Sequence, residues 1–130
     1  MANVLIAEDD ITTLKLIEGV VGAMEHETYL SSDGKYAWET LCSVSDIKLL
    51  ITDIKMPEID GRQLIEMVRN RNGLKSLPII VISGVLNINE VSDLLKLGAT
   101  NFLAKPVSVP ALQEVITNIL GPEKYRFSDK

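Results

Sequence analysis

The sequence has very few residues that could form disulfide bonds or a zinc site to support its hydrophobic core. Among its 130 residues there is one cysteine, Cys42, and one histidine, His26. An intramolecular disulfide is therefore excluded, and so is a zinc site built from cysteine and histidine ligands. A chain of this length buries roughly two-thirds of the surface that its unfolded form exposes, which suffices for an ordinary core. We expect a single soluble globular domain.

Long apolar runs are also missing. The longest, Val4–Ala7 and Ile79–Ile82, are four residues each, whereas a membrane helix needs about 20. The first residues, Met1–Asn3, carry no basic flank, and the apolar stretch after them runs into three acids at 8–10, a pattern that no secretory signal shows. We therefore expect a cytoplasmic protein with no membrane partner.

Positive charge is scarce as well. The 13 Lys and Arg residues stand against 18 Asp and Glu, which gives a formal net charge of −5 at pH 7 and a sequence pI near 4.8. A surface for nucleic acid needs clustered Lys and Arg to bind phosphates. The composition thus disfavours a direct nucleic-acid partner and leaves the excess of acids to be explained.

What is present is a regular alternation of strand and helix patterns. Five short apolar or β-branched segments fit strands: Val4–Ala7, Thr28–Ser31, Leu49–Thr52, Ile79–Ile82 and Asn101–Ala104. Each is followed by an amphipathic helical pattern: Leu14–Met24, Tyr36–Leu41, Leu64–Val68, Val91–Leu97 and Leu112–Ile119. Parallel neighbours need a crossover connection, so this (βα)₅ order predicts an α/β fold with helices on both faces of a five-stranded parallel sheet. Thr28–Ser31, the most polar segment, fits an edge strand.

Cap residues support the helix positions. Four residues stand where an N-cap side chain would accept a backbone N–H: Asp33, Asp60, Asn87 and Ser108. Glu90, three residues after Asn87, resembles the second half of a capping box. Gly98 and Gly121 are expected to end two helices. We assign one domain to residues 1–121 and a charged C-terminal tail to 122–130.

Polar side chains stand at the ends of four of the predicted strands. Glu8, Asp9 and Asp10 follow the first strand, Asp53 the third, Ser83 the fourth and Lys105 the fifth. In an open parallel sheet, ligands bind beyond the carboxyl ends of the strands, so these side chains are expected to converge on one rim. Taken singly, each has an ordinary structural reading as a first-turn acid, a turn residue, a cap or a solvated charge.

The conjunction of these residues favours a reactive site. Crowded carboxylates repel one another unless a cation is bound among them or one of them reacts. Oxygen donors without His or Cys suit a hard cation, of which Mg²⁺ fits best. A carboxylate beside such an ion can act as a nucleophile toward a phosphoryl group, while the ion and a nearby ammonium neutralise the charge on the phosphoryl oxygens.

Four segments carry a more specific pattern. They are Val4–Asp10, Leu50–Pro57 with Asp60 and Gly61, Ile82–Gly84, and Gly98–Ala99 followed by Phe102–Pro106. In this order and on these strand ends, they resemble the receiver domain of response regulators, the CheY-like family, over residues 3–120. The resemblance implies a doubly wound, flavodoxin-like sheet with strand order 2-1-3-4-5 and a part in two-component phosphorelay signalling.

The resemblance assigns the acidic residues to phosphoryl transfer and metal binding. It implies that Asp53 accepts a phosphoryl group from the phosphohistidine of a histidine kinase or a histidine phosphotransfer protein. It also implies that Asp9, Asp53 and the backbone carbonyl of Lys55 bind Mg²⁺. Glu8 would act through the water shell of the ion.

The remaining residues of the pattern would read out the phosphoryl group. Ser83 and Lys105 would take phosphoryl oxygens, Ser83 by its hydroxyl and Lys105 as a charge clamp, and Pro106 in this motif usually follows a cis peptide bond. Phe102 would be an aromatic switch that turns inward when Ser83 moves toward the phosphate. On this reading the domain is not an enzyme in the usual sense, but a phosphoacceptor with self-catalysed phosphotransfer and slow autodephosphorylation.

The implied output face combines the fourth helical pattern, the fifth strand and the last helix. Its partner would be a downstream protein target or a covalently attached output domain, and a homodimer through the same face is a further option. A stand-alone regulator and a receiver from a larger protein both fit the sequence.

Three alternatives fit less well. A haloacid-dehalogenase-like phosphatase wants a second Asp two positions after its nucleophile, where Lys55 stands. A flavodoxin-like protein that binds nucleotide or flavin is disfavoured because acids occupy the turn after the first strand and would repel phosphate. A receiver-shaped scaffold without phosphorylation is disfavoured because every reactive position is filled.

Some residues depart from the pattern or lie outside it. Gly84 stands where the family commonly has Ala, and Phe102 stands where Tyr is frequent. Cys42 and Trp38 are expected to pack in or against the core. Three arginines around the third helix fit a solvated face better than a basic patch: Arg62, Arg69 and Arg71.

Overall fold

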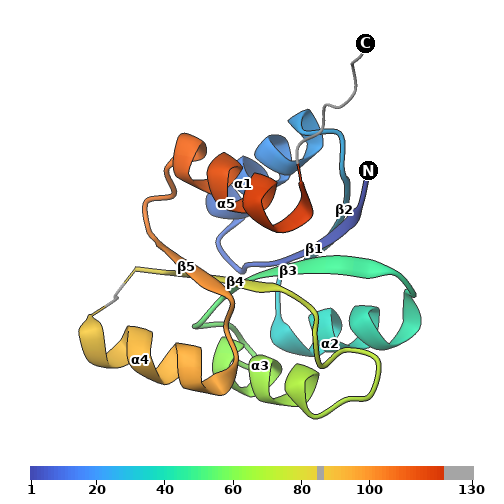
Figure 1. Ribbon diagram of the computed structural model, residues 1–130, viewed down its shortest axis with the longest axis vertical. Helices are drawn as coiled ribbons and strands as arrows, with labels where there is room; N and C mark the ends of the chain where they lie inside the picture. The colour runs from blue at the N-terminus through green and yellow to red at the C-terminus, as the bar shows by residue number, and fades with distance from the viewer. Residues whose placement is uncertain (85–86, 122–130) are drawn as a thin grey trace.

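The computed structural model describes residues 1–84 and 87–121, in which strands and helices alternate (Figure 1). The strands are β1 (Asn3–Ala7), β2 (Glu27–Ser31), β3 (Ile47–Asp53), β4 (Ile79–Ser83) and β5 (Asn101–Ala104). The helices are α1 (Ile11–Ala23), α2 (Gly34–Ser43), α3 (Gly61–Arg69), α4 (Ile88–Leu97) and α5 (Val109–Leu120). All the predicted strands and helices are present, with bounds that differ by a few residues.

The strands form one parallel sheet in the order β2-β1-β3-β4-β5. The α/β fold class and the doubly wound strand order are therefore confirmed. β2 lies at one edge, as its polar sequence predicts, and β5 lies at the other. The chain moves outward from β1 to β2 and then crosses to β3 on the other side of β1. This reversal creates a topological switch point between β1 and β3, where such sheets bind ligands.

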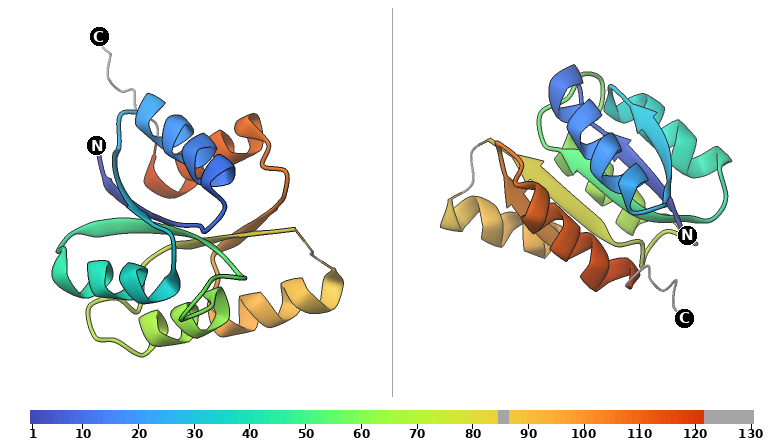
Figure 2. Two further views of the ribbon diagram at one scale, coloured as in Figure 1. Left: turned by 180° about the vertical axis from the view of Figure 1, so that it is seen from behind. Right: turned by 90° about the horizontal axis from the view of Figure 1, so that it is seen from above.

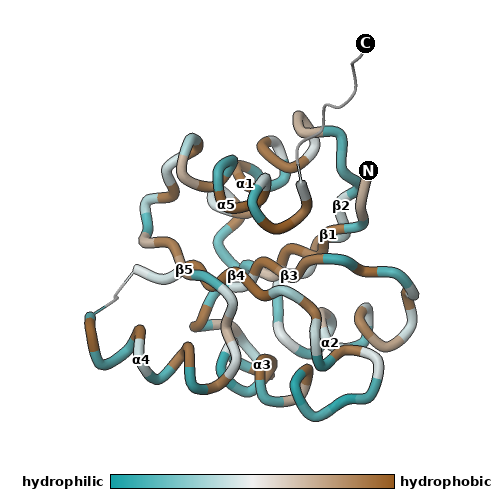
Figure 3. Tube along the Cα trace, viewed as in Figure 1, coloured by the Kyte–Doolittle hydropathy of each residue, from teal (hydrophilic) through white to brown (hydrophobic). Residues whose placement is uncertain are grey.

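Helices cover both faces of the sheet. α1 and α5 lie on one face, and α2, α3 and α4 lie on the other (Figures 1 and 2). Side chains alternate along each strand, so Val4 and Ile6 pack with α1 and α5, while Leu5 and Ala7 pack on the opposite face. Because both faces are buried, the central strands have unbroken apolar sequences. The hydrophobic stretches of the trace accordingly gather along the middle of the molecule (Figure 3).

The helix ends follow the predicted signals. The four predicted N-caps each accept the backbone N–H of the third residue after them: Asp33, Asp60, Asn87 and Ser108. Asp10 caps α1 in the same way, by accepting from the N–H of Thr13 at 3.1 Å. Gly98 ends α4 with a φ of 119°, a left-handed backbone that favours glycine. Gly121 ends α5.

The prediction for Cys42 is wrong, because this residue is exposed. The buried residues of α2 include Ala37, Thr40 and Leu41. Successive helical residues are turned by about 100° from one another, so a residue just beyond Leu41 can leave the buried face. The small apolar side chain of Cys42 is thus no guide to its burial.

The prediction of a solvated arginine face is confirmed for Arg71, which is exposed, and wrong for Arg62 and Arg69, which are half-buried. The guanidinium of Arg71 lies 5.9 Å from the centre of the Trp38 ring, and Trp38 is half-buried against the core, as expected. Arg62 and Arg69 bind groups of α4 instead of facing water alone. Each of the three side chains therefore has its own partner in the fold.

Within residues 1–84 and 87–121, no helix is both long enough and apolar enough to cross a membrane. The predicted charged tail at 122–130 lies outside the described residues.

Candidate functional site

The carboxyl ends of the central strands meet around one pocket of about 410 Å³. Eight residues line it: Asp9, Asp53, Ile54, Lys55, Ser83, Gly84, Glu90 and Lys105. Glu8 joins them through its contact with Lys105. The structure thus brings together Glu8, Asp9, Asp53, Ser83 and Lys105 at the switch point of the sheet, as predicted. Asp10 does not line the pocket, because its side chain caps α1.

Lys105 ties two carboxylates together in this pocket. Its Nζ donates to Asp53 Oδ2 at 2.8 Å and to Glu8 Oε2 at 3.2 Å, and it lies 3.1 Å from Glu8 Oε1. The peptide bond between Lys105 and Pro106 is cis, as the family pattern implies. Asp53 is only 7% exposed and Glu8 only 1%. One ammonium therefore serves two carboxylates that are almost wholly shielded from water.

The backbone around the end of β3 fixes Asp53. Its Oδ1 accepts from the backbone N–H of Ile54 at 2.6 Å. The following loop folds back so that the N–H of Gly61 donates to the carbonyl of Ile54 at 2.7 Å. A Cβ at residue 61 would lie 2.2 Å from the carbonyl oxygen of Asp53, so this close approach requires glycine. Asp60 and Gly61 thus have separate tasks, because Asp60 caps α3.

Burial and crowding shift the protonation of the pocket. Burial raises the pKa of Glu8 from its ordinary 4.5 to about 7; the Asp53 carboxylate adds to the rise, while the backbone N–H of Asp10 and the Lys105 ammonium oppose it. Burial lowers the pKa of Lys105, but its hydrogen bonds to Asp53 and Glu8 outweigh this effect and raise the pKa overall. Lys105 therefore keeps its charge at neutral pH, whereas Glu8 is protonated far more readily than an ordinary carboxyl group.

The pocket offers what a hard divalent cation needs. One carboxylate oxygen each from Glu8, Asp9 and Asp53 lie within 4.8 Å of one another. Oε1 of Glu8 is buried and accepts no hydrogen bond from the described part of the chain. Carboxylate oxygens without His or Cys suit Mg²⁺, and a cation would favour the ionised form of Glu8 that burial disfavours. The donor set therefore fits Mg²⁺.

The positions of Phe102 and Glu90 complete the description of the pocket. Phe102 of β5 is half-buried against the core under α2, α3 and α4, and it is not among the residues that line the pocket. Glu90 of α4 does line the pocket, and its carboxylate pairs with Arg62 of α3. The sequence suggests Glu90 only as part of a capping box with Asn87, so nothing local indicates that it reaches this site. A Cβ at Gly84 would meet nothing within 4 Å, so the alanine common in the family would fit.

Fold and pocket together define a doubly wound α/β protein with an acidic site for a cation or a phosphoryl group at the carboxyl edge of its sheet. The chain belongs to the response regulator receiver domain family, whose family model matches residues 4–117. It is thus a CheY-like receiver domain of two-component phosphorelay signalling.

Individual relatives agree with this assignment. The chain is 35% identical over 120 residues to the chemotaxis protein CheY1 of Helicobacter pylori, and the match covers 92% of this chain and 97% of that protein. A CheY homolog of Campylobacter jejuni is 32% identical over 120 residues, 92% of each chain.

Solved structures show the same fold. The receiver domain of a Francisella response regulator matches with a TM-score of 0.85 and 25% identity, over 92% of this chain and 96% of that one. The receiver domain of a sensor histidine kinase from Pseudomonas aeruginosa has a TM-score of 0.83 and 22% identity, over 92% and 98% of the two chains. That structure has a magnesium ion coordinated in its active site cleft.

Proposed function

We propose that Asp53 is the phosphoacceptor of this receiver domain. The observation that carries the proposal is its position: Asp53 is the last residue of β3, lines the pocket and has Lys105 Nζ at 2.8 Å from Oδ2. Phosphoryl transfer demands little of a protein beyond positioning and charge neutralisation. An oxygen of Asp53 forms the new bond to phosphorus as the phosphorus–nitrogen bond of a phosphohistidine breaks, and the electron pair stays on the imidazole nitrogen. The donor is a histidine kinase or a histidine phosphotransfer protein.

The proposed Mg²⁺ site consists of the carboxylates of Asp9 and Asp53 and the backbone carbonyl of Lys55, with Glu8 acting through water. The clustered carboxylate oxygens and the place of Lys55 in the pocket lining support it. When bound, the ion supplies positive charge against the phosphoryl oxygens. The bound magnesium of the Pseudomonas receiver supports the same choice of ion.

Ser83 and Lys105 are the proposed partners of the phosphoryl oxygens. Both line the pocket, and Ser83 stands at the end of β4 next to β5. A phosphoryl group adds about −1.5 to −2 charges, so it needs these donors as well as the ion. The Lys105 ammonium already donates to Asp53, so after phosphorylation it can donate to a phosphoryl oxygen instead of a carboxylate oxygen. Water can attack the same phosphorus, so slow autodephosphorylation accompanies the transfer.

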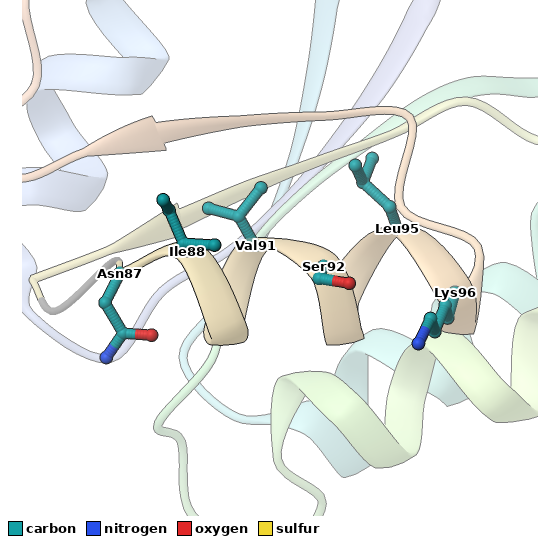
Figure 4. A pocket seen from close by; sticks show the side chains of 6 residues that line it. All are labelled: Asn87, Ile88, Val91, Ser92, Leu95 and Lys96. Carbon is teal, nitrogen blue, oxygen red and sulfur yellow. The ribbon is translucent and has the colours of Figure 1, made fainter.

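The proposed output face is formed by α4, β5 and α5. On α4, Ile88 is 86% exposed and Leu95 50% exposed, and both point to the same side of the helix as Val91 (Figure 4). They line a hollow of about 660 Å³ together with Asn87, Ser92 and Lys96. Clustered exposed apolar side chains are typical of interaction sites. The partner is a downstream protein or an attached output domain, with a homodimer as the alternative, and Phe102 on β5 is the proposed aromatic switch.

Phosphorylation by a small-molecule donor tests the assignment. We expect the wild type to gain one phosphoryl group from acetyl phosphate and Mg²⁺, as measured by intact mass, and Asp53→Asn to gain none. The matched control is Asp46→Asn, an exposed aspartate just before β3, which should react like the wild type. A stable adduct on Asp53→Asn, or a wild type that binds neither Mg²⁺ nor beryllofluoride, would refute the proposal.

A further inference from the structure

Helix α4 is anchored by few apolar contacts. Among its residues, Ile88–Leu97, Leu94 alone is buried, whereas α1, α2 and α3 bury four residues each and α5 buries two. Ile88 and Leu95 of α4 are largely exposed. Elements with few buried apolar contacts open at lower free energy than the core. Leu94 and the half-buried Leu97 pack against the core, but hydrophobic packing holds α4 less firmly than it holds the other helices, so polar contacts gain in importance.

Two arginines of α3 contact the two ends of α4. Arg62 and Arg69 lie seven residues apart, two helical turns, and so share one face of α3. Arg69 donates from Nη2 at 2.7 Å and from Nε at 3.1 Å to the carbonyl of Gly98, the residue that ends α4. Arg62 pairs with the carboxylate of Glu90 in the first turn of α4. Polar contacts thus hold α4 at its start and at its end.

The contact at the start of α4 is the one that can respond to chemistry at Asp53. Glu90 lines the same pocket as Asp53 and Lys105, so it belongs both to the pocket and to α4. A phosphoryl group on Asp53 would bring negative charge into the pocket. That charge repels the Glu90 carboxylate and attracts the Arg62 guanidinium, so both effects weaken the pair. The Arg69 contact with Gly98 involves no carboxylate and lies at the other end of the helix.

We propose that the Arg62–Glu90 pair is a latch that holds the first turn of α4 in the unphosphorylated domain and opens when Asp53 is phosphorylated. Arg69 keeps the last turn of α4 attached, so the helix moves about its C-terminal end. This proposal rests on Asp53 being the phosphoacceptor. It assigns to Arg62 and Glu90 the link between the pocket and the exposed residues of α4.

If the Arg62–Glu90 pair forms only in the unphosphorylated domain, it must weaken the binding of any ligand that favours the phosphorylated form. Arg62 and Glu90 are partly exposed, with side-chain exposures of 33% and 25%, and ion pairs of this kind change an equilibrium by about 2- to 5-fold. If the pair is intact in the free protein and broken in the phosphorylated form, the two residues are coupled in binding by that factor. If the pair is intact in both the free and the phosphorylated forms, the two residues show no coupling in binding.

The test is a double-mutant cycle on beryllofluoride affinity, measured by calorimetry in excess Mg²⁺. The four proteins are the wild type, Arg62→Gln, Glu90→Gln and the double variant. Each single change also alters the charge of the pocket, but the cycle removes this contribution and isolates the coupling. We expect the effect of Arg62→Gln on the dissociation constant to differ about 2- to 5-fold between the wild-type and Glu90→Gln backgrounds. Arg62→Gln should lower the dissociation constant for beryllofluoride more, or raise it less, when Glu90 is present than when it is replaced by Gln.

A matched cycle uses Lys48 and Asp46, an exposed pair with 2.8 Å between Nζ and Oδ1 that lies at the opposite end of β3. Lys48→Gln removes the same charge as Arg62→Gln, and this cycle should be additive. Amide hydrogen exchange gives a second readout: in free Arg62→Gln, the first turns of α4 should exchange faster, as they should in beryllofluoride-bound wild type.

The outcomes separate the two proposals. An additive Arg62–Glu90 cycle, or unchanged exchange in α4, overturns the latch while the phosphoacceptor assignment stands. A wild type that fails to bind beryllofluoride overturns both.

Discussion

The raised pKa of Glu8 makes the stability of the metal-free domain depend on pH. Burial favours the protonated form of Glu8 in the folded state, so its pKa there is about 7 against an ordinary 4.5. Between these two values the folded state binds more protons than the unfolded state, and stability therefore falls as the pH rises. The difference corresponds to roughly 3 kcal/mol, most of which is lost between pH 5 and pH 8. Above pH 8 the loss is complete.

Urea denaturation in the presence of EDTA, followed between pH 5 and pH 8, measures this loss. The variant Glu8→Gln cannot titrate at this position, so its stability should lack the decline, and the difference between the two curves isolates Glu8 from other groups. Glu66→Gln, a change at an exposed position of α3, should behave like the wild type. Two parallel curves for wild type and Glu8→Gln would refute the reasoning.

The affinity of the domain for Mg²⁺ should rise with pH, in contrast to the stability of the metal-free domain. A cation held near Glu8 favours the ionised carboxylate, so binding must displace the proton. With a pKa of about 7, the ionised fraction of Glu8 rises roughly tenfold between pH 6 and pH 8, and the apparent affinity for Mg²⁺ should rise by a similar factor. Calorimetric titration of the wild type and Glu8→Gln checks this, and an affinity that does not change with pH in the wild type would contradict it.

Two further substitutions probe the pocket. Lys105→Ala removes the ammonium that contacts Asp53, so we expect some phosphorylation by acetyl phosphate but a weakened conformational response in α4, as seen by hydrogen exchange; an unchanged response would remove the clamp role. Gly61→Ala places a Cβ 2.2 Å from the Asp53 carbonyl oxygen, so the loop must shift. We expect a loss of about 1–3 kcal/mol in urea denaturation, whereas Gly22→Ala, with nothing within 4 Å of its Cβ, should be neutral or stabilising.

The fold was largely predictable because its determinants are local. Unbroken apolar segments such as Ile79–Ile82 mark strands that are buried on both faces, and the caps at Asp33 and Asn87 mark helix starts within a residue. The strand order could not be predicted in this way, because periodicity does not reveal which strands are neighbours. The order 2-1-3-4-5 was predicted from the resemblance to the receiver-domain family.

The site was predictable as a set of residues but not as an electrostatic environment. The positions of Asp53 and Lys105 at strand ends follow from parallel topology, since all carboxyl ends lie at one edge. The pKa of Glu8 depends on how completely the fold excludes water from it, which no spacing reveals. Arg62 and Glu90 were missed as a pair because they lie on separate helices and each has an ordinary local reading.

The contacts of Lys105 also join distant parts of the chain. Its ammonium contacts Asp53, 52 residues earlier, and Glu8, 97 residues earlier. During synthesis, the first carboxylates are made long before the ammonium that neutralises them, and no shorter stretch of the chain holds all three groups. A chain that has emerged only through β4 therefore carries the acids without their counter-charge. The charge balance of the pocket is therefore complete only when β5 has joined the sheet and has brought Lys105 to the two carboxylates.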